Sequence, residues 1–172
     1  MENGWILVNN DERIINEIRT YLEKEGDKLK EQSKGFVLLT ESKKPITTIS
    51  TFSSDWRRTI NSSTESSANS LYKTTSETFI IEDKYKLYSL ILLTLKYKGI
   101  LPIEVDVDYD ISEELHLTEI DTRISSLESF KFLFERIRKA SKTIVIVSKL
   151  FRMGENGDLD KEYIKKRTIT KL

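Results

Sequence analysis

The first strong pattern of apolar residues predicts an amphipathic helix near the start of the chain. In NNDERIINEIRTYLEKEG, apolar side chains recur at helical spacing, at Ile14, Ile15, Ile18, Tyr21 and Leu22. Asn9 and Glu12 stand where a capping box would begin the helix. Two ends are compatible with the pattern: the helix stops at Gly26, or it continues for two more turns through DKLKEQSK.

The following segment changes from helical to β-rich patterning. The runs Phe36–Thr40 and Ile46–Phe52 flank the turn-like ESKKP and predict a β-hairpin. A stretch rich in Ser and Thr comes next, and it resembles a linker in composition. Its larger side chains fall close to one helical stripe, which favours a packed helix of small residues over Trp56–Leu71.

The segment TFIIEDKYKLYSLILLTLKYKG fits both periods, because alternate residues and helically spaced residues are both apolar. Its aromatic and β-branched content favours two strands within residues 79–98, with a turn near Asp83 and Lys84. After Gly99 and Pro102, the alternation in IEVDVDYDI predicts a half-buried strand over Ile103–Ile111, with its acids on the outer side.

The last part of the pattern combines one more strand with a helix. ELHLTEIDTRI can return beside the acidic strand, with SEE as the connection. Ser125 to Glu128 is a capping-box candidate before an amphipathic helix running from Leu127 to Ala140. The short apolar run KTIVIVS predicts a strand buried on both faces.

These elements indicate an α+β fold with a mainly antiparallel sheet and two to four packing helices. We expect residues 1–153 to form a single domain and residues 154–172 to form a basic C-terminal tail that is at most partly ordered.

Composition then restricts the chemistry. The chain has 172 residues, 38% of them hydrophobic and 33% charged, and no cysteine, so disulfides, thiolate zinc sites and cysteine nucleophiles are excluded. No glycine-rich phosphate-binding motif is present, and we expect no cofactor. No apolar run is long enough to cross a membrane, so a cytoplasmic protein is expected.

The formal net charge is zero, but the charges are unevenly distributed along the chain. Residues 100–127 hold eight acids and one base, whereas residues 128–172 hold twelve bases and six acids. The two segments either lie beside each other or present a surface to a partner.

Two of the acids in 104–110, together with acids from the following segment, are candidates for a Mg²⁺ or Ca²⁺ site of a metal-dependent nuclease or phosphodiesterase. The residues are Asp106, Asp108, Glu119 and Asp121. A calcium loop beginning at Asp106 is excluded, because Ile111 and Leu117 occupy the positions of its glycine and glutamate. Glu82 and Lys84 could alternatively supply the Glu-x-Lys pair of a nuclease.

Basic residues form a second candidate surface, for nucleic acid or another acidic partner, or for the acidic strand of the same chain. These residues are Arg136, Lys139, Lys142, Lys165, Lys166 and Arg167. His116 is the only histidine, and without a G-x-S-x-G motif a serine triad is not indicated, so a structural or surface role is expected for it.

The helix at Ile14 followed by GFVLLTESKKPITTIS, within residues 14–52, resembles the Roadblock and longin-like superfamily of small α/β adaptor domains in its order of elements. The resemblance implies a noncatalytic platform that dimerises and docks a small GTPase or a complex subunit. Our leading expectation is accordingly a noncatalytic protein-interaction or regulatory domain that binds a protein partner, with a homodimer as one form. The metal-dependent enzyme and the nucleic-acid-binding protein are the alternatives.

Overall fold

The computed structural model of the chain describes residues 10–42, 75–97 and 101–169. Their helices and strands follow one another in this order: α1 (Asn10–Gln32), β1 (Val37–Ser42), β2 (Thr75–Asp83), β3 (Ser89–Tyr97), β4 (Ile103–Val107), α2 (Tyr109–Glu114), β5 (Arg123–Ile124), α3 (Leu127–Lys139), α4 (Ser141–Glu155) and α5 (Asp158–Ile169).

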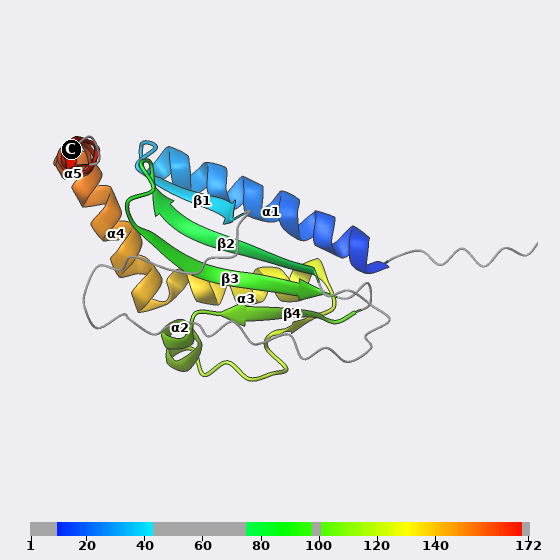
Figure 1. The fold of residues 1–172 in the computed structure, drawn as a ribbon. Helices are drawn as coiled ribbons and strands as arrows, with labels where there is room; N and C mark the ends of the chain where they lie inside the picture. Colours follow the sequence, from blue (N-terminus) through cyan, green and yellow to red (C-terminus); the bar gives the residue numbers. More distant parts are fainter. Residues whose placement is uncertain (1–9, 43–74, 98–100, 170–172) are drawn as a thin grey trace, which may run out of the picture.

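The strands form one sheet in the order β1-β2-β3-β4-β5, and each pairs with its neighbour in antiparallel orientation (Figure 1). This arrangement confirms the predicted α+β class with an antiparallel sheet. The segment 79–98, whose pattern fits both a helix and strands, contributes to strands β2 and β3. The turn between them is fixed by the buried Asp83 carboxylate, which accepts hydrogen bonds from the backbone N–H groups of Tyr85 at 2.8 Å and Tyr88 at 2.7 Å.

Helix α1 continues past Gly26 to Gln32, which is the longer of the two predicted forms. A β-carbon at Gly26 would lie 3.2 Å from the backbone oxygen of Leu39, so the glycine allows α1 to pack closely on β1. The other half of the predicted hairpin, Ile46–Phe52, and the predicted helix Trp56–Leu71 lie outside the described residues.

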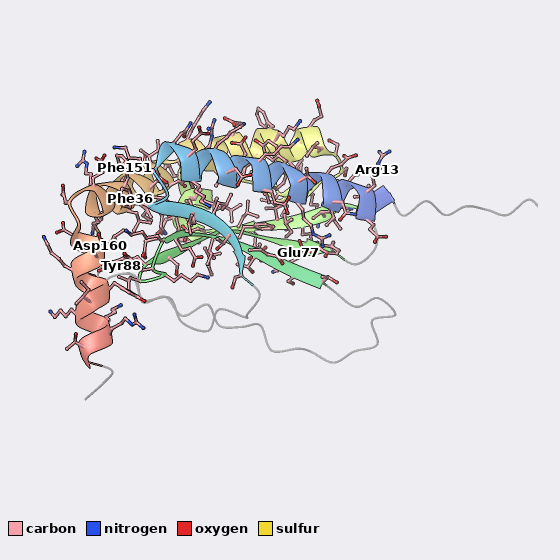
Figure 2. The ribbon with its side chains drawn as sticks, turned by 90° about the horizontal axis from the view of Figure 1, so that it is seen from above. Arg13, Phe36, Glu77, Tyr88, Phe151 and Asp160 are labelled. Atoms are coloured by element: carbon pink, nitrogen blue, oxygen red, sulfur yellow. The ribbon has the colours of Figure 1, made fainter. Side chains whose placement is uncertain are left out.

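Helices α1, α3 and α4 lie on one face of the sheet (Figure 2). The core between them joins Ile18 and Leu22 of α1 to Leu93 and Leu95 of β3, and all four side chains are almost fully buried. Helix α3 forms as predicted, although its N-cap is Ser126, one residue later than expected, with Ser129 closing the capping box.

The prediction of a strand at KTIVIVS is wrong, because these residues belong to helix α4. The buried side chains of α4 are Thr143, Ile146 and Leu150, which recur at helical spacing, whereas Ile144 and Val145 point to solvent. In a strand buried on both faces, Ile144 and Val145 would have been buried as well.

The acidic strand is shorter than predicted, because β4 ends at Val107. Asp108 leaves the strand to cap α2, and its carboxylate accepts hydrogen bonds from the N–H groups of Asp110 and Ile111. The acids therefore do not form one row along a strand. The predicted return strand ELHLTEIDTRI is reduced to Arg123–Ile124, and SEE lies in α2.

Helix α5 packs against the turn between β2 and β3, at the same end of the molecule as Phe36 and Phe151 (Figure 2). Leu159 is fully buried, and the Tyr85 ring stacks on Tyr163 with 4.3 Å between centroids. The hydroxyl of Tyr88 donates to Glu162, so part of the segment after residue 153 is attached to the sheet by specific contacts.

Candidate functional site

The acidic residues of the predicted metal site each have a partner within the chain. Lys96 on the adjacent strand β3 lies opposite Glu104 in the register and pairs diagonally with Asp106. The Lys142 ammonium lies 2.6 Å from Asp108 Oδ1 and 2.7 Å from Asp110 Oδ2, and its side chain is only 11% exposed. Lysines thus neutralise three of the four acids between residues 104 and 110.

The other two metal candidates lie in the segment between α2 and β5. Asp121 accepts hydrogen bonds from the hydroxyl and backbone N–H of Thr118, and these bonds, together with Arg136 at 3.1 Å, hold the pKa of its carboxyl below the usual range. Glu119 is exposed and lies 3.7 Å from Arg123. Among the described residues, no three His, Asp or Glu side chains are placed to hold a metal ion together.

The alternative nuclease pair does not share a site either. Glu82 is buried in β2 and accepts a hydrogen bond from the Thr40 hydroxyl at 2.9 Å. Lys84 instead pairs with Asp160 of α5 at 2.9 Å. His116 is exposed and adopts a positive φ of 50° in the turn after α2.

The six predicted basic residues divide between two parts of the fold. Arg136 and Lys142 pair with acids of residues 100–127, and Lys139 lies 3.8 Å from Glu135. The remaining three are exposed on α5, where Lys166 lies over the Tyr88 ring and Arg167 over the Tyr163 ring. The acidic and basic segments therefore neutralise each other in part.

A half-buried ion pair that the sequence pattern did not reveal joins α1 to the sheet. The Arg19 guanidinium donates to both oxygens of Glu77 on β2, and the Tyr97 hydroxyl of β3 donates to the same carboxylate. Burial alone would raise the pKa of Glu77, but these hydrogen bonds outweigh it and the pKa is lowered. Burial and the bond to Glu77 raise the pKa of Tyr97 to about 12. Because Arg19, Glu77 and Tyr97 are hydrogen-bonded to one another, we interpret this cluster as structural.

A groove lies between α1 and α4, and α3 also contributes to its lining. Its volume is about 240 Å³, and β1, β2 and β3 form its floor. The apolar lining consists of Leu29, Leu39, Ile81, Leu92, Phe134, Ile144 and Val147, and the polar lining of Glu25, Lys28, Gln32, Arg138, Thr143 and Ser148. Ile81, Leu92 and Phe134 at its base are at most 3% exposed, so the accessible apolar surface comes mainly from the half-buried Leu29, Leu39 and Val147 and from Ile144.

Two polar groups of the groove are buried. The Glu25 side chain of α1 is 9% exposed, and its one hydrogen bond within the described residues comes from Lys28 Nζ at 2.6 Å. On α4, Thr143 is 3% exposed, and its hydroxyl has no hydrogen-bond partner. A buried hydroxyl without a partner is unusual, because most such groups are satisfied in folded proteins.

The rim of the groove is partly apolar as well. Ile144 borders it with 51% of its surface exposed, and Val145 beside it is 62% exposed. Of the lining residues, none was singled out as a site residue from the sequence. A second hollow, between α1 and the start of α3, is larger at about 420 Å³ but is lined mainly by exposed polar side chains such as Arg13, Glu17 and Lys24.

No protein-family model, curated protein or solved structure matches the chain. In the part of the chain that the structure describes, none of the helices has the length and apolar character needed to cross a membrane. The groove between α1 and α4 is consequently the feature on which a functional proposal rests.

Proposed function

We propose that the protein is a noncatalytic protein-interaction domain, and that the groove between α1 and α4 binds an apolar segment of a partner protein. The observation that supports this proposal is the accessible apolar lining between two helices, formed by the half-buried Leu29, Leu39 and Val147 with the exposed Ile144 at its rim. Grooves of this kind receive the apolar face of a short helix or an extended peptide.

The size of the groove indicates what it can hold. At about 240 Å³ it is smaller than the pockets that enclose drug-sized molecules, which begin at about 300 Å³. One or two side chains, apolar or with a long apolar stem, would occupy it, and an apolar side chain contributes about 1.5 to 3 kcal/mol when fully buried. Additional contacts with the exposed side chains of α4 are therefore part of the interface.

The chemistry of the lining favours binding over catalysis. The ionisable groups of the groove are Glu25, Lys28 and Arg138, and each has an ion-pair partner, since Lys28 pairs with Glu25 and Arg138 with Glu135 at 2.7 Å. A general base or nucleophile would need a second group positioned to activate it. Among the groove residues that the structure describes, no hydroxyl is hydrogen-bonded to one of these charged groups, and the Lys28 amine is engaged in the ion pair with Glu25.

Site-specific photocrosslinking in the protein's own cells tests the proposal. A photoreactive amino acid is placed at Gln32, which is exposed at the groove, and in a separate variant at Ser148 on the opposite wall. Control variants carry it at Ser76 and Glu104, which are exposed on strands away from the groove. We expect both groove positions to capture the same protein and the control positions not to capture it.

A blocking variant makes the result specific to the groove. With the crosslinker at Gln32, Ser148→Trp should abolish capture, because a bulky ring at the rim fills the groove while the exposed position leaves the fold intact. Capture of the same protein from Ser76, or capture that persists in Ser148→Trp, would refute the groove as the docking site.

A further inference from the structure

We propose that the partner enters the groove with an arginine side chain, whose guanidinium binds both Glu25 and Thr143. This inference rests on the proposed function and specifies the chemistry of the bound segment. It follows from two buried polar groups that face one apolar groove from α1 and from α4.

The Glu25 carboxylate is the anionic part of the site. A buried carboxylate is costly unless it is paired and hydrogen-bonded, and it offers about four acceptor positions. Its hydrogen bond within the described residues comes from Lys28, whose side chain is 63% exposed and lies one turn further along the same helix. Pairs of this exposed kind contribute little, so Glu25 retains both the capacity and the electrostatic need for another cation.

The Thr143 hydroxyl is the neutral part of the site. It is buried without a partner, and it lines the groove together with Glu25. A purely apolar occupant would leave this hydroxyl unsatisfied and would bury Glu25 further. An occupant with several N–H donors satisfies both groups, because the hydroxyl oxygen and the carboxylate are both acceptors.

A guanidinium group fits these requirements better than an ammonium or an amide. It carries five N–H donors in a planar fork, it stays charged, and it is less strongly hydrated than an ammonium. Its aliphatic stem can lie against the apolar floor formed by Leu39, Ile81 and Leu92 while the charged end reaches the walls.

The basic residues already at the groove do not occupy this position. Arg138 lines the groove and attracts the Glu25 carboxylate electrostatically, but its Nη2 donates its hydrogen bond to Glu135 at 2.7 Å. Lys28 is the direct competitor for Glu25, and its exposure allows it to move into solvent when another cation binds.

Binding measurements with the crosslinked segment test the inference. The segment captured at Gln32 and Ser148 is identified by mass spectrometry and synthesised as a labelled peptide, and its affinity for the full chain is measured by fluorescence anisotropy. We expect the segment to contain an arginine. Glu25→Gln should weaken binding about tenfold or more, and replacement of that arginine by citrulline, which is uncharged and of the same shape, should weaken it similarly.

Measuring the citrulline peptide against Glu25→Gln distinguishes a direct contact between the guanidinium and Glu25 from a general loss of affinity. If the guanidinium binds Glu25, the citrulline peptide should lose little further affinity for Glu25→Gln, because the interaction is already absent. Thr143→Val should weaken binding several-fold, whereas Lys28→Gln should leave it unchanged or tighter, since a competing cation is removed. Circular dichroism confirms that each variant is folded.

Several results would refute the inference of a bound arginine without refuting the groove as the docking site. These are a captured segment without arginine, a Glu25→Gln variant that binds as tightly as the parent, or a Lys28→Gln variant that loses as much affinity as Glu25→Gln. Failure of both groove positions to capture any protein would instead overturn the proposed function itself.

Discussion

Replacing Glu77 with glutamine should destabilise the protein at neutral pH, because it removes the carboxylate that links α1 to β2 and β3. The carboxylate receives two hydrogen bonds from Arg19 and one from Tyr97. Breaking a buried ion pair costs about 3 to 5 kcal/mol when the remaining charge stays buried. The Arg19 side chain is 38% exposed, so water solvates part of the charge left behind. We therefore expect a loss of about 2 kcal/mol, or about 4 to 8 °C in Tm for a chain of this size.

The effect of Glu77→Gln should also depend on pH in a defined direction. The pKa of Glu77 is lowered in the folded protein from its ordinary value of 4.5. Its contribution to stability is thus fully present above pH 4.5 and is lost as pH falls through the folded-state pKa. The difference between the parent protein and Glu77→Gln should be largest at pH 7 and should shrink below pH 4.5.

Urea unfolding followed by circular dichroism at pH 7 and at a lower pH measures both effects. Glu23→Gln is the matched control, because Glu23 is exposed on α1 and its loss should leave stability nearly unchanged. Equal stability of Glu77→Gln and the parent at pH 7 would refute the structural role of the pair. A stability difference between the parent protein and Glu77→Gln that stays constant as the pH falls below 4.5 would refute the lowered pKa of Glu77.

Three further substitutions test the packing and charge of the fold by thermal unfolding. Thr143→Val should raise stability by about 1 kcal/mol, since the buried hydroxyl has no partner and valine has the same shape, and a loss instead would mean that the hydroxyl is satisfied. Gly154→Ala should lower stability by about 1 to 3 kcal/mol, because a β-carbon there would overlap the ring of Phe36; an unchanged Tm would refute that close packing. Lys142→Met should lower stability by about 1 to 2 kcal/mol, less so in high salt, since the half-buried Asp108 loses its cation, and a salt-independent loss would point to lost packing.

The parts of the fold that could be predicted are those in which local pattern and tertiary environment agree. In α1, the apolar spacing from Ile14 to Leu22 matches the buried face of the helix. The β-branched and aromatic residues of β2 and β3 likewise match a sheet with one well-covered face.

Predictions failed where a short apolar run was interpreted without its neighbours. KTIVIVS alone resembles a strand, but with the residues up to Gly154 the buried positions follow a helical period. At Asp108, the alternating pattern continues while the backbone changes, because the carboxylate caps α2. An aspartate followed by acids in the next turn is a helix-start signal, and it could have indicated where the strand ends.

The groove could not be predicted from the sequence, since it depends on how far apart α1 and α4 lie on the sheet. Glu25 resembles any other glutamate of a charged helix until the packing of α1 buries it. The sequence pattern around Thr143 predicts a strand, and a strand there does not bring its hydroxyl to the groove that Glu25 lines. Spaces between elements come from long-range packing, which local patterns do not encode.

The order of the strands in the sheet bears on folding kinetics. Strand β3 pairs with β2 before it and with β4 after it in the chain, so these two hairpins close short loops and should form early. The contact between Tyr85 and Asp160 joins residues 75 positions apart, so the docking of α5 requires a much larger loop to close. We expect refolding to complete the meander first and to attach the C-terminal helix last, which stopped-flow fluorescence of Tyr85→Phe can follow.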